Sequence, residues 1–111
     1  MTISELFAQL SVEVLCEGDM HKEISRGVTG DLLSFIMGNA PKPAAWVTIL
    51  GHINVVAVAV LREIPCIIVA GGKTPDPQMV SRCAQEGIAL GTSKESAFSL
   101  CARMGALGLK G

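Results

Sequence analysis

The sequence contains few aromatic residues, which make up 4% of its 111 residues, although half of all residues are hydrophobic. It also lacks a long uninterrupted apolar run. The most apolar stretch, residues 44–70, contains Thr48, His52, Asn54, Arg62, Glu63 and Pro65. A helix that spans a bilayer needs about 20 apolar residues in succession. We therefore expect no membrane segment, and we interpret the apolar residues as buried α/β structure that is partly covered by a second copy of the chain.

Clustered charge is missing as well. Nine basic and ten acidic residues are scattered along the chain and give a formal net charge of -1 at pH 7. Surfaces that bind nucleic acid or anionic membranes need a concentration of basic residues, so neither is expected as a partner. The first residues lack the basic and apolar regions of a secretory signal, which predicts a cytoplasmic protein.

The four cysteines are far apart in the sequence and form no CxxC pair: they are Cys16, Cys66, Cys83 and Cys101. Structural zinc sites and most iron–sulfur sites take at least two ligands from one tight loop. We therefore predict no metal, no iron–sulfur cluster and no other cofactor. The cysteines are expected to be reduced thiols that are buried or half-buried.

The sequence does contain a repeated pattern of apolar strand, glycine turn and helix. Apolar runs at residues 44–50, 66–70 and 88–90 end at Gly51, Gly71 and Gly91. Short runs without polar alternation are typical of parallel strands that are buried on both faces. Two further strands are expected at residues 12–15 and 24–28. The pattern predicts a single α/β domain, residues 1–111, with a mostly parallel sheet.

Capping signals predict where three helices begin. Thr2 and Glu5 have capping-box spacing for a short first helix, and Thr92 and Glu95 have the same spacing before the last one. Asp76-Pro77 provides an N-cap acceptor followed by proline at the first helical position, which predicts a helix that ends near Gly87.

Two more helices are predicted from the pattern of apolar residues. Residues 31–39 predict an amphipathic helix that is ended by Gly38 and Asn39. Residues 53–61 favour a strand by propensity, but a strand is already expected on each side of them. We therefore interpret this segment as a helix that is apolar on nearly all sides and fully buried against the sheet or a partner subunit.

The loops after parallel strands meet at one edge of the sheet, where α/β proteins usually bind ligands. The candidate binding residues lie on these loops: Gly30, Asp31, His52, Asn54, Gly71, Gly72, Lys73, Thr74, Thr92 and Ser93. Residues 70–74 resemble the end of a phosphate-binding loop, but Ile67 stands where that pattern requires glycine. Two interpretations stay open for this loop: contact with an anion through Lys73, Thr74 and the following helix, or a plain turn.

No complete catalytic set is visible in the sequence. His52 has no neighbouring nucleophile with an orienting carboxylate. Asp31, Asp76, Thr92 and Ser93 could converge with it, but each is also explained as a helix cap. The sequence therefore predicts no enzyme, and His52 either binds a ligand or has a structural or interface role. Trp46 is expected in the core or in a dimer interface.

Residues 28–37, 46–59 and 67–76 resemble, in this order, the DRTGG domain family, and residues 86–98 are similar to the family's last strand and helix. This family is similar to the N-terminal domain of HPr kinase/phosphatase and occurs beside CBS domains. The resemblance implies a three-layer α/β/α fold with a mostly parallel central sheet. It also implies a regulatory or interaction module, because the kinase's own phosphate-binding loop lies in another domain.

These observations lead to one main hypothesis and two alternatives. The main hypothesis is a non-catalytic regulatory module, a homodimer, that senses a small anionic ligand or docks onto a protein of a metabolic or redox system. The first alternative is an accessory protein with an iron–sulfur cluster, associated with a hydrogenase, which is a label that some family members carry. The second is an enzyme that acts on a phosphorylated metabolite through His52, Lys73 and Thr92.

Overall fold

A computed structural model describes all of residues 1–111 as five helices and five strands. The helices are α1 (Ile3–Leu10), α2 (Leu33–Asn39), α3 (Ile53–Leu61), α4 (Pro77–Glu86) and α5 (Ala97–Ala106). The strands are β1 (Glu13–Cys16), β2 (Arg26–Thr29), β3 (Ala44–Thr48), β4 (Cys66–Val69) and β5 (Ala89–Thr92). They form one sheet with the order β1-β5-β4-β3-β2. Neighbouring strands are parallel except β1, which is antiparallel to β5.

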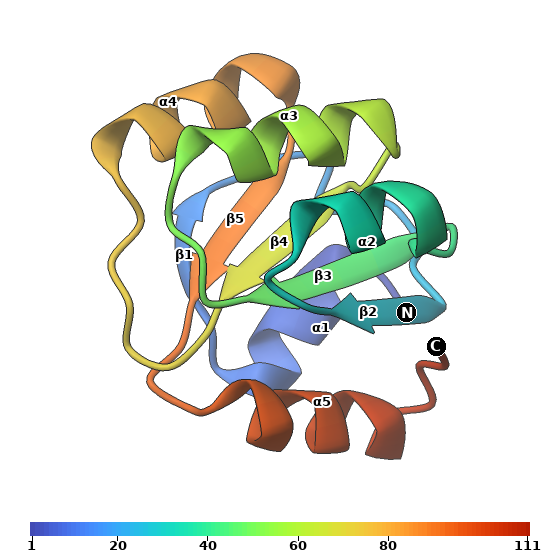
Figure 1. Cartoon of the computed structure of the whole chain (residues 1–111). Coiled ribbons are helices and arrows are strands. Elements are labelled where there is room, and N and C mark those ends of the chain that lie inside the picture. The colour runs from blue at the N-terminus through green and yellow to red at the C-terminus, as the bar shows by residue number, and fades with distance from the viewer.

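The sheet is the middle of three layers (Figure 1). Helices α1 and α5 cover one face, and α2, α3 and α4 cover the other. Alternate strand residues face opposite layers: Ala45 and Val47 of β3 belong to the core under α1 and α5, whereas Trp46 belongs to the core on the opposite face. The predicted α/β class, with its mostly parallel sheet in three layers, is confirmed.

Every predicted helix and strand is present, and most ends differ from the predicted ones by no more than three residues. The exception is the last helix, which begins four residues later than its predicted cap at Thr92 implied. The segment 53–61, which was ambiguous in the sequence, is helix α3 with the predicted bounds. Its conformation follows from topology, because β3 and β4 are parallel neighbours and a parallel pair needs a crossover between its strands. Trp46 is fully buried, and its Nε1–H donates a hydrogen bond to the Gly30 carbonyl at 3.0 Å.

The prediction that the helix at residues 53–61 is fully buried is wrong for the single chain. Val55, Val56, Val58 and Ala59 are buried, but Leu61 is 69% exposed and Ile53 and Val60 are also exposed. The helix packs against the sheet on one side, so its opposite side faces outward even though that side is apolar.

The predicted capping box of the first helix is confirmed, but the one for the last helix is wrong. Thr92 is still part of β5, where it pairs with Glu13 of β1. Ser96 caps α5 instead, since its hydroxyl accepts a hydrogen bond from the Ser99 amide at 3.1 Å. Glu95 forms an ion pair with Arg103.

Helix α4 begins and ends where the sequence predicted. Asp76 is at the N-cap and Pro77 follows at the first helical position, although the Asp76 side chain makes no capping hydrogen bond. Gly87 ends the helix with φ of 70°, a left-handed conformation that glycine adopts without strain.

The four cysteines are unpaired, with Cys16, Cys66 and Cys83 buried and Cys101 half-buried, as predicted. The structure holds no group of three His, Cys, Asp or Glu side chains suited to bind a metal ion. No helix has the length and apolar character needed to cross a membrane.

Candidate functional site

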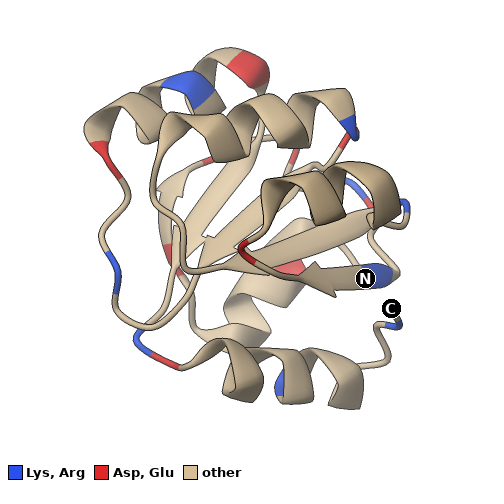
Figure 2. Ribbon diagram, viewed as in Figure 1, with Lys and Arg blue, Asp and Glu red and all other residues tan.

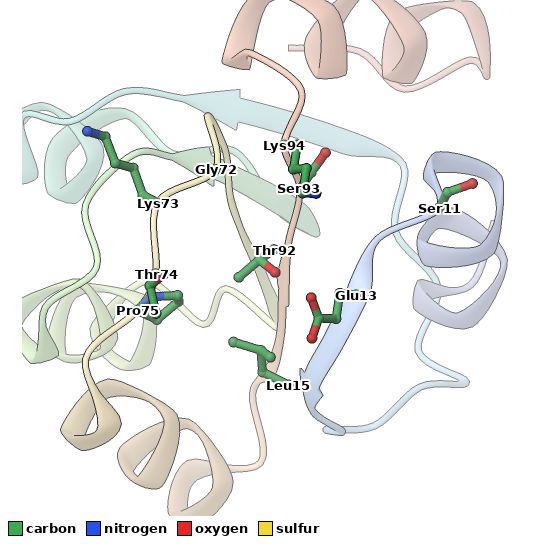
Figure 3. A pocket seen from close by; sticks show the side chains of 10 residues that line it. All are labelled: Ser11, Glu13, Leu15, Gly72, Lys73, Thr74, Pro75, Thr92, Ser93 and Lys94. Atoms are coloured by element: carbon green, nitrogen blue, oxygen red, sulfur yellow. The ribbon is translucent and has the colours of Figure 1, made fainter.

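A polar cavity of about 600 Å³ lies at the edge of the sheet where β4 and β5 end (Figure 3). We call it the edge pocket. One wall comes from the turn before β1 and from β1 itself, and the other from the loops that follow β4 and β5. Its lining residues are Ser11, Glu13, Leu15, Gly72, Lys73, Thr74, Pro75, Thr92, Ser93 and Lys94.

Two backbone hydrogen bonds hold the loops of the edge pocket together. The Gly71 amide donates to the Glu95 carbonyl at 2.7 Å, and the Gly72 amide donates to the Ser93 carbonyl at 2.9 Å. Both glycines have φ near +70°, a conformation that other residues rarely adopt. The paired glycines therefore build the turn, and their amides are already occupied. These two amides are therefore not free to bind an anion.

Other groups of the pocket are available to bind a ligand. The amides of Thr74 and Lys94 donate to no acceptor within the protein. Hydroxyl groups line both walls, and the loop wall also includes Lys73 and Lys94. Figure 3 shows the Lys73 side chain extended away from Thr92, so this exposed lysine stands at the rim of the pocket. The donors suit a small anion, since phosphate binds to lysines, hydroxyls and backbone amides.

Half of the predicted site residues meet in the edge pocket, namely Gly72, Lys73, Thr74, Thr92 and Ser93. Gly71 adjoins them in the chain. The other predicted residues, Gly30, Asp31, His52 and Asn54, follow β2 and β3 and do not line the pocket. Of the predicted loops, only those after β4 and β5 contribute to this cavity.

Asp31 has a structural role that differs from the predicted helix cap. Leu32, not Asp31, is at the N-cap of α2. One oxygen of the Asp31 carboxylate, Oδ1, accepts hydrogen bonds from the Thr48 hydroxyl at 2.8 Å and from the Ile49 amide at 2.9 Å. Thr48 is buried. Asp31 therefore joins the loop after β2 to the end of β3.

His52 is at the N-cap of α3 but makes no capping hydrogen bond. Its Nδ1 atom is buried without a hydrogen-bond partner, and the neighbouring Asn54 is exposed. Because His52 does not line the edge pocket, the set of His52, Lys73 and Thr92 that the enzyme alternative requires is not assembled there.

The sequence analysis missed Ser11, Glu13, Leu15, Pro75 and Lys94. Pro75 and Lys94 adjoin predicted residues and could have been included with them. The other three were hidden because their position depends on the antiparallel pairing of β1 with β5, which places Glu13 opposite Thr92. No local pattern in the sequence indicates which strand β1 joins.

Neither the protein-family models nor the curated proteins include a match to this chain. Among solved structures, the chain is similar to the CBS and DRTGG domains of the regulatory region of a Clostridium perfringens pyrophosphatase, crystallised with its activator, diadenosine tetraphosphate. The TM-score is 0.74 at 13% identity, over 93% of this chain and 45% of that chain. This chain thus spans less than half the length of that structure. The likeness shows a shared fold, the three-layer fold that the DRTGG resemblance implied.

Proposed function

We propose that residues 1–111 form a single DRTGG-like regulatory domain that senses a small phosphate-bearing ligand in the edge pocket and catalyses no reaction. The observation that carries this proposal is the concentration of lysine, hydroxyl and unpartnered amide donors in one cavity at the carboxyl edge of a parallel sheet. The similar pyrophosphatase region, which is regulatory and was crystallised with a nucleotide activator, supports the same function.

The composition of the pocket favours binding over catalysis. Its lining includes no histidine and no cysteine, and Glu13 is its one carboxylate. Acid–base chemistry usually needs a second titratable partner, and covalent chemistry needs an activated nucleophile. The geometry favours neither the enzyme alternative nor the iron–sulfur alternative, since their residues do not come together.

Thermal melting in the presence of phosphate-bearing compounds tests the proposal. Pyrophosphate, tripolyphosphate, sugar phosphates and nucleotides form a suitable panel. At a concentration 100-fold above Kd, a ligand adds about 2.7 kcal/mol of stability, so the melting temperature should rise by several degrees. The compound should be recovered unchanged.

A matched pair of variants shows whether the edge pocket is responsible. The double variant Lys73→Ala/Lys94→Ala should lose most of the melting shift, because it removes both cations of the pocket. Lys22→Ala/Lys110→Ala removes two exposed lysines elsewhere and should keep the shift. A panel that produces no shift in the natural protein would refute the proposal, and so would turnover of the stabilising compound.

We also propose that the protein is a homodimer whose subunits meet through helices α2 and α3. These neighbouring helices expose apolar side chains, including Phe35, Leu61 and Leu32 at the start of α2. Neither helix contains a charged residue, whereas α4 and α5 do (Figure 2). An uncharged apolar face can meet an identical face across a two-fold axis without repulsion, which favours a second copy as the occupant.

A further inference from the structure

A second cavity adjoins the edge pocket and continues it along the surface. It is an open groove of about 670 Å³ between β1 and α4, and it shares the lining residues Leu15 and Pro75 with the edge pocket. We call it the side groove. A phosphate or a sugar phosphate would occupy the edge pocket alone, so the side groove indicates a larger ligand.

The two cavities differ in chemistry. The edge pocket carries lysines and hydroxyls, whereas Leu15, Val80 and Ala84 give the side groove an apolar surface. Its rim carries the polar side chains of Glu17 and Ser81. The combined site therefore suits a ligand with an anionic end and a flat apolar end that has polar groups on its edge.

Glu13 indicates what joins these two ends. Figure 3 shows its carboxylate beside both Thr92 and Leu15, where the polar part of the site meets the apolar part. A carboxylate repels phosphate, and it accepts hydrogen bonds but donates none. Two adjacent hydroxyl groups are a suitable partner, because both can donate to one carboxylate, as a ribose diol does in dinucleotide sites.

We infer that the edge pocket and the side groove together bind one ribonucleotide, an inference that rests on the proposed function. The phosphates lie beside Lys73 and Lys94, and Glu13 accepts hydrogen bonds from the ribose hydroxyls. The base passes between Leu15 and Pro75 into the side groove. Since the Glu17 carboxylate accepts hydrogen bonds, it favours a base with an exocyclic amino group.

Calorimetric titration at pH 7 tests the inference with four compounds of similar charge: adenosine triphosphate, its 2′,3′-dideoxy analogue, inosine triphosphate and inorganic tripolyphosphate. Adenosine triphosphate should bind at least about tenfold more tightly than tripolyphosphate, since it adds the apolar contacts of the base and charge-assisted hydrogen bonds. The affinities of the dideoxy analogue and of inosine triphosphate should lie between those of adenosine triphosphate and tripolyphosphate.

Three variants locate each contact. Glu13→Gln should remove the preference for ribose over dideoxyribose. Ala84→Glu places a bulky charged side chain at an exposed position of the side groove, and it should weaken nucleotide binding to the level of tripolyphosphate. Gln85→Glu adds the same charge at an exposed neighbouring position that does not line the groove, and it should bind like the natural protein.

The outcomes separate this inference from the proposed function. Equal affinities for adenosine triphosphate and tripolyphosphate would overturn the inference and leave the proposed function intact. If adenosine triphosphate binds more tightly than tripolyphosphate and neither Glu13→Gln nor Ala84→Glu reduces this difference, the nucleotide does not lie in these two cavities. That result would also overturn the inference. Binding of none of the four compounds would overturn both.

Discussion

Cys66 and Cys83 are buried in different cores, on opposite faces of the sheet. Burial raises the pKa of each thiol from its ordinary value of 9.0 to about 12, because the thiolate would lose its contact with water. For Cys83, the neighbouring Cys16 thiol adds to the effect. Cys101, on α5, is half-buried. Cys16 lines the side groove but is also buried, and burial raises the pKa of its thiol. Thiol chemistry at the surface of the folded protein should therefore be confined to Cys101.

Labelling with a chromogenic disulfide reagent at pH 8 should show one fast thiol. The Cys101→Ser variant should lose the fast phase, and the remaining thiols should react only as fast as the protein unfolds. Fast labelling that persists in Cys101→Ser would contradict the burial of the other cysteines.

The same two thiols predict how stability depends on alkaline pH. Below pH 9 they are neutral in the folded and in the unfolded chain, so their contribution to stability is fully present. Between about pH 9 and pH 12 they ionise only in the unfolded chain, which lowers the free energy of unfolding by up to about 1.4 kcal/mol per pH unit for each thiol.

Urea unfolding between pH 8 and pH 11 measures this slope. The chain contains no tyrosine, so no phenol contributes to the slope in this range. The double variant Cys66→Ala/Cys83→Ala should be less stable at pH 8, because it leaves small cavities, but its stability should fall less steeply above pH 9. If the stability of this variant falls with pH as steeply as that of the natural protein, the two thiols ionise alike in the folded and the unfolded chain, and the prediction is wrong.

At the scale of single elements, two glycines differ in how much space surrounds them: Gly91 is tightly packed, and Gly105 is not. Gly91 lies in β5 where α1 and the residue before β1 pack on it: a Cβ atom there would overlap Cγ1 of Val12 and would lie 3.3 Å from Cε2 of Phe7. Gly105 lies within α5, and a Cβ atom there would meet nothing within 4 Å. The first position requires the absence of a side chain, and the second does not.

The two alanine substitutions should therefore have opposite effects. Gly91→Ala should destabilise the protein by about 1–3 kcal/mol through overpacking, and Gly105→Ala should stabilise it by about 0.5–1 kcal/mol through helix propensity. Denaturant unfolding at pH 7 compares the two variants. A stable Gly91→Ala variant would mean that Val12 and Phe7 repack without cost.

The helices and strands could be predicted well because their signals are local. The Thr2–Glu5 capping box, Pro77 after Asp76 and the closing Gly87 each act within one turn of helix. The last helix shows the limit of such signals. Thr92 and Glu95 have capping spacing too, but pairing with β1 keeps Thr92 in the sheet, and a tertiary contact overrides the local preference.

At the scale of the whole molecule, the exposed apolar face of α2 and α3 predicts self-association. Sedimentation at micromolar concentration should give a species of about twice the 11.6 kDa of one chain. Leu61→Glu introduces a charge into this face and should give the monomer.

Phe98→Glu is the matched control for the dimer. Phe98 is 84% exposed, but it lies on α5, across the sheet from α2 and α3. This variant should stay dimeric. A natural protein that sediments only as a monomer would refute the dimer, and so would a dimer that Leu61→Glu leaves intact.

The sequence by itself determined the order of helices and strands, the parallel character of most of the sheet and the edge at which its loops gather. These features follow from apolar patterns, glycine turns and capping residues, which depend on neighbours along the chain. Only the tertiary structure decided which loops share a cavity. The antiparallel pairing of β1 with β5 brings Glu13 and Leu15 to the edge pocket. Asp31 does not line this pocket, because its carboxylate accepts hydrogen bonds from Thr48 and Ile49. The physical reason is that strand pairing and polar contacts between loops join residues far apart in the sequence, and packing of the two cores selects among the possible partners.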